Sequence, residues 1–460
     1  MRRAVDSARW SPGRRSPGRG RRNAPLPYSW RGSRTILGAV GLRKLIRRAR
    51  SRADYTWFLA AREWPVLVSA LGVLLGAITI LPSAVGIVLS LLALVLGIVT
   101  FVRDLRQLRG RWSAYEFSSI ASPFPHQRIP APAAYPASQY LHFANRGTAL
   151  VSDEIDRALR ERSFTAVVDE QPYALPPLLR ATAPHVLPIR ARGRLLFNGA
   201  VVGMRTDPLP GAGGAPTPIR LHRARFFDVQ CSNELCSMRI TRRDTGEEFD
   251  PRTRLLTDAS GRLRTLAAGE LADVVGISTL ALTTDGHVLL VLQSDRNAAS
   301  PMLLAPSGSG SLEPRDLKGP GGAVHGALRD SLRAGMEREL REETGLPAEA
   351  LAGTELTGFA RWMERGAKPE FFGVTRLSVS SAEVRGTRAK GAELLYSEGV
   401  DAVGIDLAAL GEELRAGTGV LAADSLPDKI RDVGSLPLLL ALRAAALVEA
   451  GEAAVEERRP

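Results

Sequence analysis

The longest feature of the hydrophobic pattern is a run of 39 residues without a charged side chain between Glu63 and Arg103. As one straight helix, this run would extend roughly 58 Å, about twice the hydrocarbon thickness of a bilayer. Pro82 divides it into 65–81 and 84–102, each close to the length of one membrane crossing. The pattern therefore predicts a two-helix transmembrane hairpin, and a buried helical pair in a soluble domain is the alternative.

The basic residues are concentrated before this run. Residues 1–63 hold 17 Lys and Arg but 3 Asp and Glu, whereas the rest of the chain holds 44 and 45, so the net charge of +13 comes from the N-terminal segment. We expect a disordered basic tail at 1–35 and a basic juxtamembrane helix at 36–63. Because arginines also follow the apolar run, the positive-inside rule places both termini in the cytoplasm. A polybasic tail attracts anionic lipids and nucleic acid alike, but without a folded recognition module no specific nucleic-acid recognition is expected.

The part of the chain after the apolar run begins with a proline-rich segment. Five prolines between positions 121 and 138 indicate a linker, which we place at 104–150. A small β-rich middle domain of unassigned function is expected at 151–271. Ser152 is expected to cap its first helix. The predicted strands of this domain are 194–197, 200–204 and 225–230.

Alternation of apolar residues becomes clear again after position 275. An Asp285-Gly286 turn between two apolar arms, 276–284 and 287–292, predicts a β-hairpin. Later strands are expected at 302–305, 354–360 and 371–377. The pattern also predicts helices at 404–414 and 436–457, the second capped by Ser435 and packed on the folded body.

The candidate chemistry lies in Arg338-Glu339-Leu340-Arg341-Glu342-Glu343-Thr344-Gly345-Leu346. On a helix, the three glutamates fall within a sector of about 100°, beside an apolar stripe with four-residue steps (Leu328, Leu332, Met336, Leu340). Carboxylates this close repel one another unless a cation lies among them, and hard oxygen ligands suit Mg²⁺ or Mn²⁺. Gly345 is expected to end the helix in a left-handed conformation. The alternative is an exposed charged helix with internal ion pairs.

These nine residues resemble the core of the Nudix hydrolase signature, and all seven specified positions match. The resemblance covers roughly 272–410. Upstream, the family has Gly and Glu where this chain has Val324 and Asp330. Its glycine-rich turn is represented by 306–313, followed by an insert that is unusual for the family.

The resemblance implies an α+β fold in which a mixed sheet lies in an α/β/α sandwich, preceded here by the transmembrane hairpin and the β-rich middle region. It implies hydrolysis of a nucleoside diphosphate linked to another moiety. Glu339, Glu342 and Glu343 would bind Mg²⁺ (or Mn²⁺), and Arg338 would orient the carboxylates. Substrate contacts are expected from a further set of residues, namely Gly308, Gly310, Arg361 and Glu370.

The sequence lacks the motifs of other common enzyme and binding-site classes. There is no phosphate-binding loop, dinucleotide fingerprint or nucleophile elbow, and the six histidines have no metal-ligand spacing. The two cysteines, Cys231 and Cys236, are too few for a disulfide framework and indicate a reducing compartment, with metal binding or redox sensing as a less favoured alternative.

The leading hypothesis is a membrane-anchored, cytoplasm-facing, Mg²⁺-dependent Nudix-type hydrolase acting on a nucleotide-type small molecule. A catalytically silent Nudix-like binding module is the second, motivated by Val324, Asp330 and the insert. A scaffold for a membrane complex is the third. The expected division of the chain is 1–35 tail, 36–63 basic helix, 64–103 hairpin, 104–150 linker, 151–271 middle domain, 272–415 hydrolase domain, and 416–460 C-terminal helix and tail.

Overall fold

The computed structural model describes the greater part of the chain after position 48, and all described residues except Ala49 belong to one unit, Arg50–Pro460. The tail expected at 1–35 lies outside the described residues, as do most of the basic helix and of the first hairpin arm. The described ranges are 49–55, 57–58, 68–69, 71–73, 84–112, 114–119, 129–190, 196–211, 217–294, 302–319, 322, 326–384 and 397–456.

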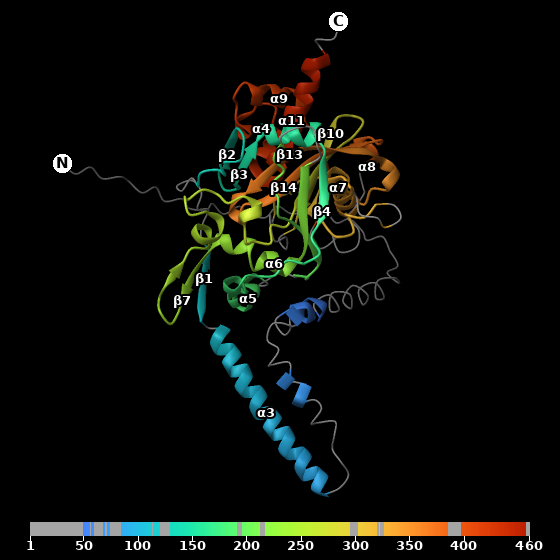
Figure 1. The fold of residues 1–460 in the computed structure, drawn as a ribbon. Coiled ribbons are helices and arrows are strands. Elements are labelled where there is room, and N and C mark those ends of the chain that lie inside the picture. The colour runs from blue at the N-terminus through green and yellow to red at the C-terminus, as the bar shows by residue number, and fades with distance from the viewer. Residues whose placement is uncertain are drawn as a thin grey trace, which may run out of the picture. The chain divides into compact units, whose positions relative to one another are not determined.

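Within the described ranges, the main sheet has nine strands in mixed orientation. Figure 1 shows where this sheet lies in the fold. Its long path runs β11-β10-β9-β14-β13-β3-β2, with β12 paired to β9 and β15 paired to β10. The central pair β9/β14 is parallel and the other pairs are antiparallel. The strands are β2 (Ser138–Phe143), β3 (Gly147–Ser152), β9 (Gly276–Leu282), β10 (His287–Gln293), β11 (Leu304–Ala305), β12 (Gly308–Ser311), β13 (Leu351–Trp362), β14 (Lys368–Leu377) and β15 (Ser397–Gly404).

Helices cover both faces of this sheet. Neighbouring residues of a strand point to opposite faces, and Phe371 of β14 packs in one core with Met336 of α7 (Leu328–Thr344). Phe372 packs instead in a second core with α11 (Leu436–Glu456) and α9 (Leu407–Arg415). The predicted mixed sheet between helices is therefore confirmed, and α7 lies on the face opposite to α11.

The local predictions around this sheet were largely correct. Gly286 has φ 76°, as the predicted hairpin turn requires, and Ser152 and Ser435 each accept a backbone N–H near the start of a helix. The helix expected at 404–414 begins three residues later, because the Asp406 side chain caps it by accepting from Ala409 N. Short helices α8 (Ser381–Val384) and α10 (Asp428–Val433) complete this region.

Among its described residues, the middle region contains two small sheets. One has the order β4-β6-β5, formed by Phe164–Val168, Thr217–Arg225 and Ala200–Met204, and the other has β1-β7-β8, formed by Tyr115–Ser119, Met238–Arg242 and Glu248–Phe249. Its helices are α4 (Asp153–Glu161), α5 (Pro177–Arg190) and α6 (Phe226–Gln230). The strand predicted at 225–230 was wrong, because Asp228 accepts the Arg225 N–H and Asn198 accepts the Phe227 N–H, which together favour a helical start over an extended chain.

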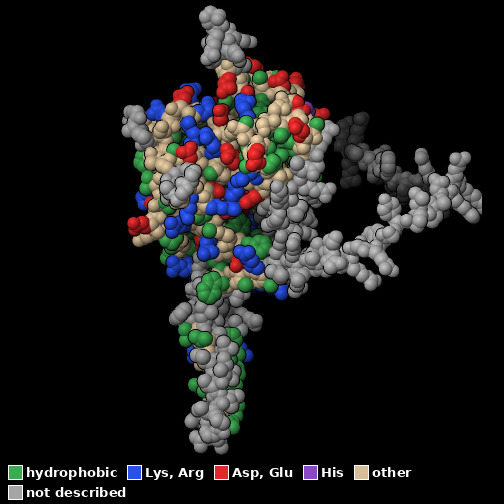
Figure 2. All heavy atoms as spheres, turned by 90° about the vertical axis from the view of Figure 1, so that its right-hand side faces the viewer, with side chains coloured by type: hydrophobic (Ala, Val, Ile, Leu, Met, Phe, Trp, Pro, Cys, Tyr) green, Lys and Arg blue, Asp and Glu red, His purple; other side chains and the backbone are tan. Residues whose placement is uncertain are grey.

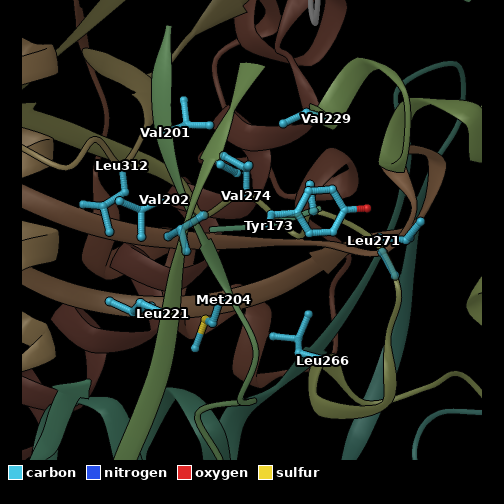
Figure 3. Close-up of a cluster of buried hydrophobic side chains, with 14 of the residues drawn as sticks. Tyr173, Val201, Val202, Met204, Leu221, Val229, Leu266, Leu271, Val274 and Leu312 are labelled. Carbon is cyan, nitrogen blue, oxygen red and sulfur yellow. The ribbon is translucent and has the colours of Figure 1, made fainter. Parts of the chain in front are cut away.

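The middle region and the main sheet share one hydrophobic core. Figure 3 shows part of it, in which Val202 and Met204 of β5 lie among Leu221, Val274 and Leu312. The backbone continues this contact, since Val202 N donates to Leu312 O and Val275 N donates to Val202 O. Strand β2 and the first four residues of β3 fall within the range expected as a linker, and the two strands extend the main sheet at β13. The domain boundaries themselves stay a prediction.

The second arm of the predicted hairpin lies in α3 (Ala84–Trp112), a helix of 29 residues. Its large apolar side chains are exposed, for example Val88, Leu92 and Leu96 at 59, 62 and 64% (Figure 2). Within the described ranges, no helix meets the combined requirement of length and apolar character for crossing a membrane. The transmembrane hairpin is therefore not supported.

Candidate active site

The four signature side chains lie in the second half of α7. The predicted apolar stripe is confirmed, because Leu328, Leu332, Met336 and Leu340 are at most 1% exposed and fix the helix against the sheet. Gly345 ends the helix with φ 78°, a left-handed conformation that glycine adopts without strain. The neighbouring sector carries Arg338 and the three glutamates toward β12.

Arg338 is the centre of a charge network. Its Nε and Nη2 each donate to one oxygen of Asp316 at 2.8 Å, while Nη1 contacts Glu339 at 2.8 Å and Glu342 at 3.4 Å. Nη2 also donates to the Ser311 carbonyl at 3.0 Å. Burial alone would lower the pKa of Arg338, but hydrogen bonds with Asp316 and the charge of Glu339 raise it above its ordinary value. The guanidinium is thus a fixed cation that holds two of the three glutamates.

Strand β12 reaches these carboxylates through its glycines. A Cβ on Gly310 would overlap Glu339 Oε1 and lie 2.8 Å from Oε2, so only glycine permits this approach. A Cβ on Gly308 would lie 2.6 Å from Leu340 Cα. Ser309 N donates to Glu343 Oε2 at 3.2 Å. The two glycines predicted as substrate contacts therefore lie beside the carboxylates and set the spacing between β12 and α7.

An open cavity of about 570 Å³ adjoins Glu342. Arg315, Asp316, Arg338, Arg341 and Glu342 contribute to its wall. The Glu342 side chain is 38% exposed and pairs with Arg315 at 3.1 Å, so this glutamate is the most accessible of the three. Sequence reasoning missed Asp316 and Arg315, because both lie in the insert that has no counterpart in the signature. Arg341 occupies an unspecified signature position.

The two other predicted contacts do not join this cluster. Glu370 shares the β14 face of Phe372, opposite to α7, and its Oε1 accepts from buried Lys368 at 2.6 Å. Arg361 is 3% exposed and pairs with Asp207 at 3.0 Å, and it also donates to Tyr135. Both side chains are buried in the interior, where Arg361 links β13 to Asp207 of the middle region and Glu370 pairs within β14.

The atypical upstream positions are only partly described. Val324 lies outside the described residues, and His325 does as well. Asp330 is exposed in the first turn of α7, about two turns before Arg338. This places its short carboxylate at the other end of the helix from Glu342 and Glu343.

The donor chemistry of the cluster fits a divalent cation. Glu339 and Glu342 contact the same guanidinium nitrogen, and Glu339 and Glu343 both lie against β12, so all three carboxylates converge on one region. Hard oxygen donors of this kind are the ones that Mg²⁺ prefers. Among the residues that the structure describes, no group of three or more His, Cys, Asp or Glu side chains is already arranged around one point.

The two cysteines belong to the core and not to a site. Cys231 and Cys236 are buried and not joined by a disulfide. Burial is the main reason that the pKa of the Cys236 thiol is raised, which suppresses the thiolate needed for metal binding or redox chemistry.

Comparison with known proteins gives little further guidance. No family model and no curated protein matches the chain. Among solved structures, the protein DR0079 from Deinococcus radiodurans is 17% identical, with 35% of this chain and 88% of that chain covered and a TM-score of 0.20. A MutT protein from Methanosarcina mazei Go1 is 15% identical, with 40% and 96% covered and a TM-score of 0.22. Because both TM-scores lie far below 0.5, these likenesses do not bear on the function of this chain.

Proposed function

We propose that the chain is a divalent-metal-dependent hydrolase of the Nudix type, which cleaves a pyrophosphate bond in a nucleoside diphosphate linked to another moiety. The observation that carries the proposal is the arrangement of three carboxylates on a helix packed against a mixed sheet. Glu339 and Glu342 pair with Arg338, and Glu343 accepts from Ser309 N of the adjoining strand β12. The signature match at these positions supports the same activity.

The residues of the site suggest separate tasks. A divalent ion bound by the three carboxylates would supply countercharge to the diphosphate. Glu342 is the most exposed carboxylate and would take the proton of the attacking water, whose oxygen forms the new bond to phosphorus as the bridging P–O bond breaks. Arg315 and Arg341, on the wall of the adjoining cavity, would bind phosphate oxygens. Arg338 and Asp316 would position the carboxylates.

The test is turnover of a panel of nucleoside diphosphate compounds by the purified full-length protein, with Mg²⁺, Mn²⁺ or EDTA. We expect metal-dependent release of phosphate-ester products, reduced about 10²-fold or more in Glu342→Gln and in Glu343→Gln. Glu337→Gln is the matched control, because Glu337 lies on the same helix outside the signature positions and should leave turnover unchanged. Full turnover in Glu343→Gln would contradict the assignment.

A silent ligand-binding module is the second candidate. It is favoured by the exposed Asp330 at the position of a family glutamate, and by the lack of a preformed three-ligand group among the described residues. Nucleotide binding that is equally tight with Mg²⁺ and with EDTA, in the absence of hydrolysis, would favour this candidate over the enzyme.

We keep the location at a membrane, with both termini in the cytoplasm, as a proposal separate from the activity. It rests on the uncharged run and the basic segments around it. Fractionation of cells that express the full chain tests it, since recovery in the high-salt or carbonate-soluble fraction would exclude an integral membrane anchor.

A further inference from the structure

A second and larger cavity lies beside the N-terminal half of α7. Its volume is about 960 Å³, and α4, α7, β13, α9 and α11 contribute to its wall. Five arginines line it, namely Arg157, Arg160, Arg329, Arg333 and Arg415. None of them lines the cavity beside Glu342.

Most of these guanidinium groups are held in place by backbone carbonyls. Arg329 Nη2 donates to Leu159 O and Arg160 O, and Arg160 Nη1 donates to Thr357 O at 3.0 Å. Arg333 Nε donates to Thr354 O at 2.9 Å, and Arg415 Nη2 donates to Leu447 O at 3.1 Å. A guanidinium group carries five N–H donors, and each of these bonds uses only one or two of them. Arg415 also donates to Glu412 through Nη1. The remaining N–H donors of the arginines stay available in a fixed orientation.

The positive charge around the cavity is only partly balanced. Within the described part of the chain, Arg157, Arg160, Arg329 and Arg333 form no ion pair with a carboxylate. Asp153 also lines the cavity, but its carboxylate pairs with Arg443 at 2.7 Å. Glu355 and Glu452 are the remaining acidic residues of the wall. Like charges gathered around one space repel one another, and a bound anion would relieve that repulsion.

Strand β13 is irregular where it lines the cavity. Thr357 lies between Leu356 and Gly358, where the β13/β14 register shifts and Thr357 has no opposite residue. Bulges of this kind are frequent beside functional sites. The Thr357 carbonyl at this bulge accepts from Arg160 Nη1 and so helps to hold one of the cavity arginines.

From these observations we infer that the arginine-lined cavity binds a small ligand with a chain of phosphate groups, such as a nucleoside triphosphate or an inorganic polyphosphate. Planar guanidinium groups pair with phosphate oxygens in bidentate fashion, and several arginines on different walls match several linked phosphates better than a single one. The volume falls in the range of sites for nucleotide-sized ligands. This site is separate from the carboxylate cluster and does not depend on the proposed hydrolysis.

The experiment is calorimetric titration of the full chain with tripolyphosphate in EDTA, which removes any metal at the carboxylate cluster. We expect one tripolyphosphate per chain, bound at least tenfold more tightly than orthophosphate. Parallel titration with ATP distinguishes a nucleoside triphosphate from an inorganic polyphosphate as the ligand. Tighter binding of ATP than of tripolyphosphate would show that the nucleoside contributes to binding.

Variants in the wall decide whether the cavity is the site. Arg157→Gln and Arg333→Gln should each weaken binding about tenfold or more, since each removes a charged donor. The Arg157 side chain is exposed and makes no hydrogen bond with the described residues, so its variant tests the site even if Arg333→Gln disturbs folding. Arg239→Gln is the control, because Arg239 lies in β7 and is 53% exposed.

Three outcomes would overturn the inference. These are absence of tripolyphosphate binding by the wild-type protein, binding that Arg157→Gln leaves unchanged, and binding that Arg239→Gln weakens as strongly as the wall variants. The turnover of Glu343→Gln has no bearing on these three binding outcomes. The binding proposal and the hydrolase proposal can therefore fail independently.

Discussion

The two glycines of β12 allow the active-site geometry to be tested separately from the stability of the fold. In Gly310→Ala, the three atoms nearest to the new methyl group belong to the end of the Glu339 side chain, which can rotate away. In Gly308→Ala, it would meet the backbone of Leu340, which cannot move without shifting α7. The same chemical change is therefore expected to have different consequences at two positions in one strand.

The magnitudes follow from the groups that must move. Displacing Glu339 breaks its 2.8 Å contact with Arg338, which costs roughly 1.5–3 kcal/mol for a charged hydrogen bond. Alanine also lowers the conformational entropy of the unfolded chain relative to glycine, which offsets about 0.5–1 kcal/mol of this loss of stability. We expect Gly310→Ala to lose about 1–2 kcal/mol of unfolding free energy. Overpacking against backbone at Gly308 is expected to cost about 3 kcal/mol.

The assays are urea unfolding and metal-dependent turnover, measured on both variants. Gly310→Ala should lose about 10²-fold in turnover, because a shift of about 1 Å in a reacting or metal-binding group has that effect, while the protein stays folded. Equal losses of stability in the two variants, or full turnover in Gly310→Ala, would refute the reasoning that β12 sets the position of Glu339.

Three further predictions concern the charged interior. Asp316→Ala removes the two Asp316 oxygens that accept from Arg338. Because this leaves a buried cation half-paired, it should cost about 3–5 kcal/mol in urea unfolding, with Asp316→Asn less severe. Arg361→Met leaves Asp207 buried without its cation and should cost a similar 3–5 kcal/mol in the same assay, whereas an unchanged midpoint would show that the pair contributes nothing. Burial raises the pKa of Asp156 to about 7, so its charged form is disfavoured in the folded state, and its contribution to stability falls by about 1.4 kcal/mol per pH unit as pH rises from about 4 to 7. Asp156→Asn keeps an acceptor for Phe359 N, so its stability relative to wild type should increase over that pH range, and a constant difference would contradict the assigned pKa.

Local patterns predicted the parts of the fold that local interactions determine. The apolar stripe of α7, its Gly345 cap and the Asp285-Gly286 turn depend on residues a few positions apart, and all three are confirmed. The signature also located Arg338 and the three glutamates on one helix. Whether these residues perform the proposed chemistry stays a prediction.

Features that depend on distant partners could not be predicted in this way. Glu370 and Arg361 resemble site residues in the sequence, but Lys368, Asp207 and Tyr135 hold them in the interior. The 225–230 segment has the composition of a strand, yet side chains of Asn198 and Asp228 begin a helix there. The pairing of β3 with β13 could not be predicted either, because it is not visible in either segment alone.

That pairing has a consequence for the order in which the chain becomes structured during synthesis. The Asp156 carboxylate accepts from Phe359 N across 203 positions, and β3 finds its partner only when residues 360–362 have been made. Until then, the β2–β3 hairpin has an unpaired edge, and such an edge is prone to pair with other chains. A nascent or truncated chain that ends before β13 would therefore carry an aggregation-prone strand, and the complete main sheet can form only after translation has passed that point.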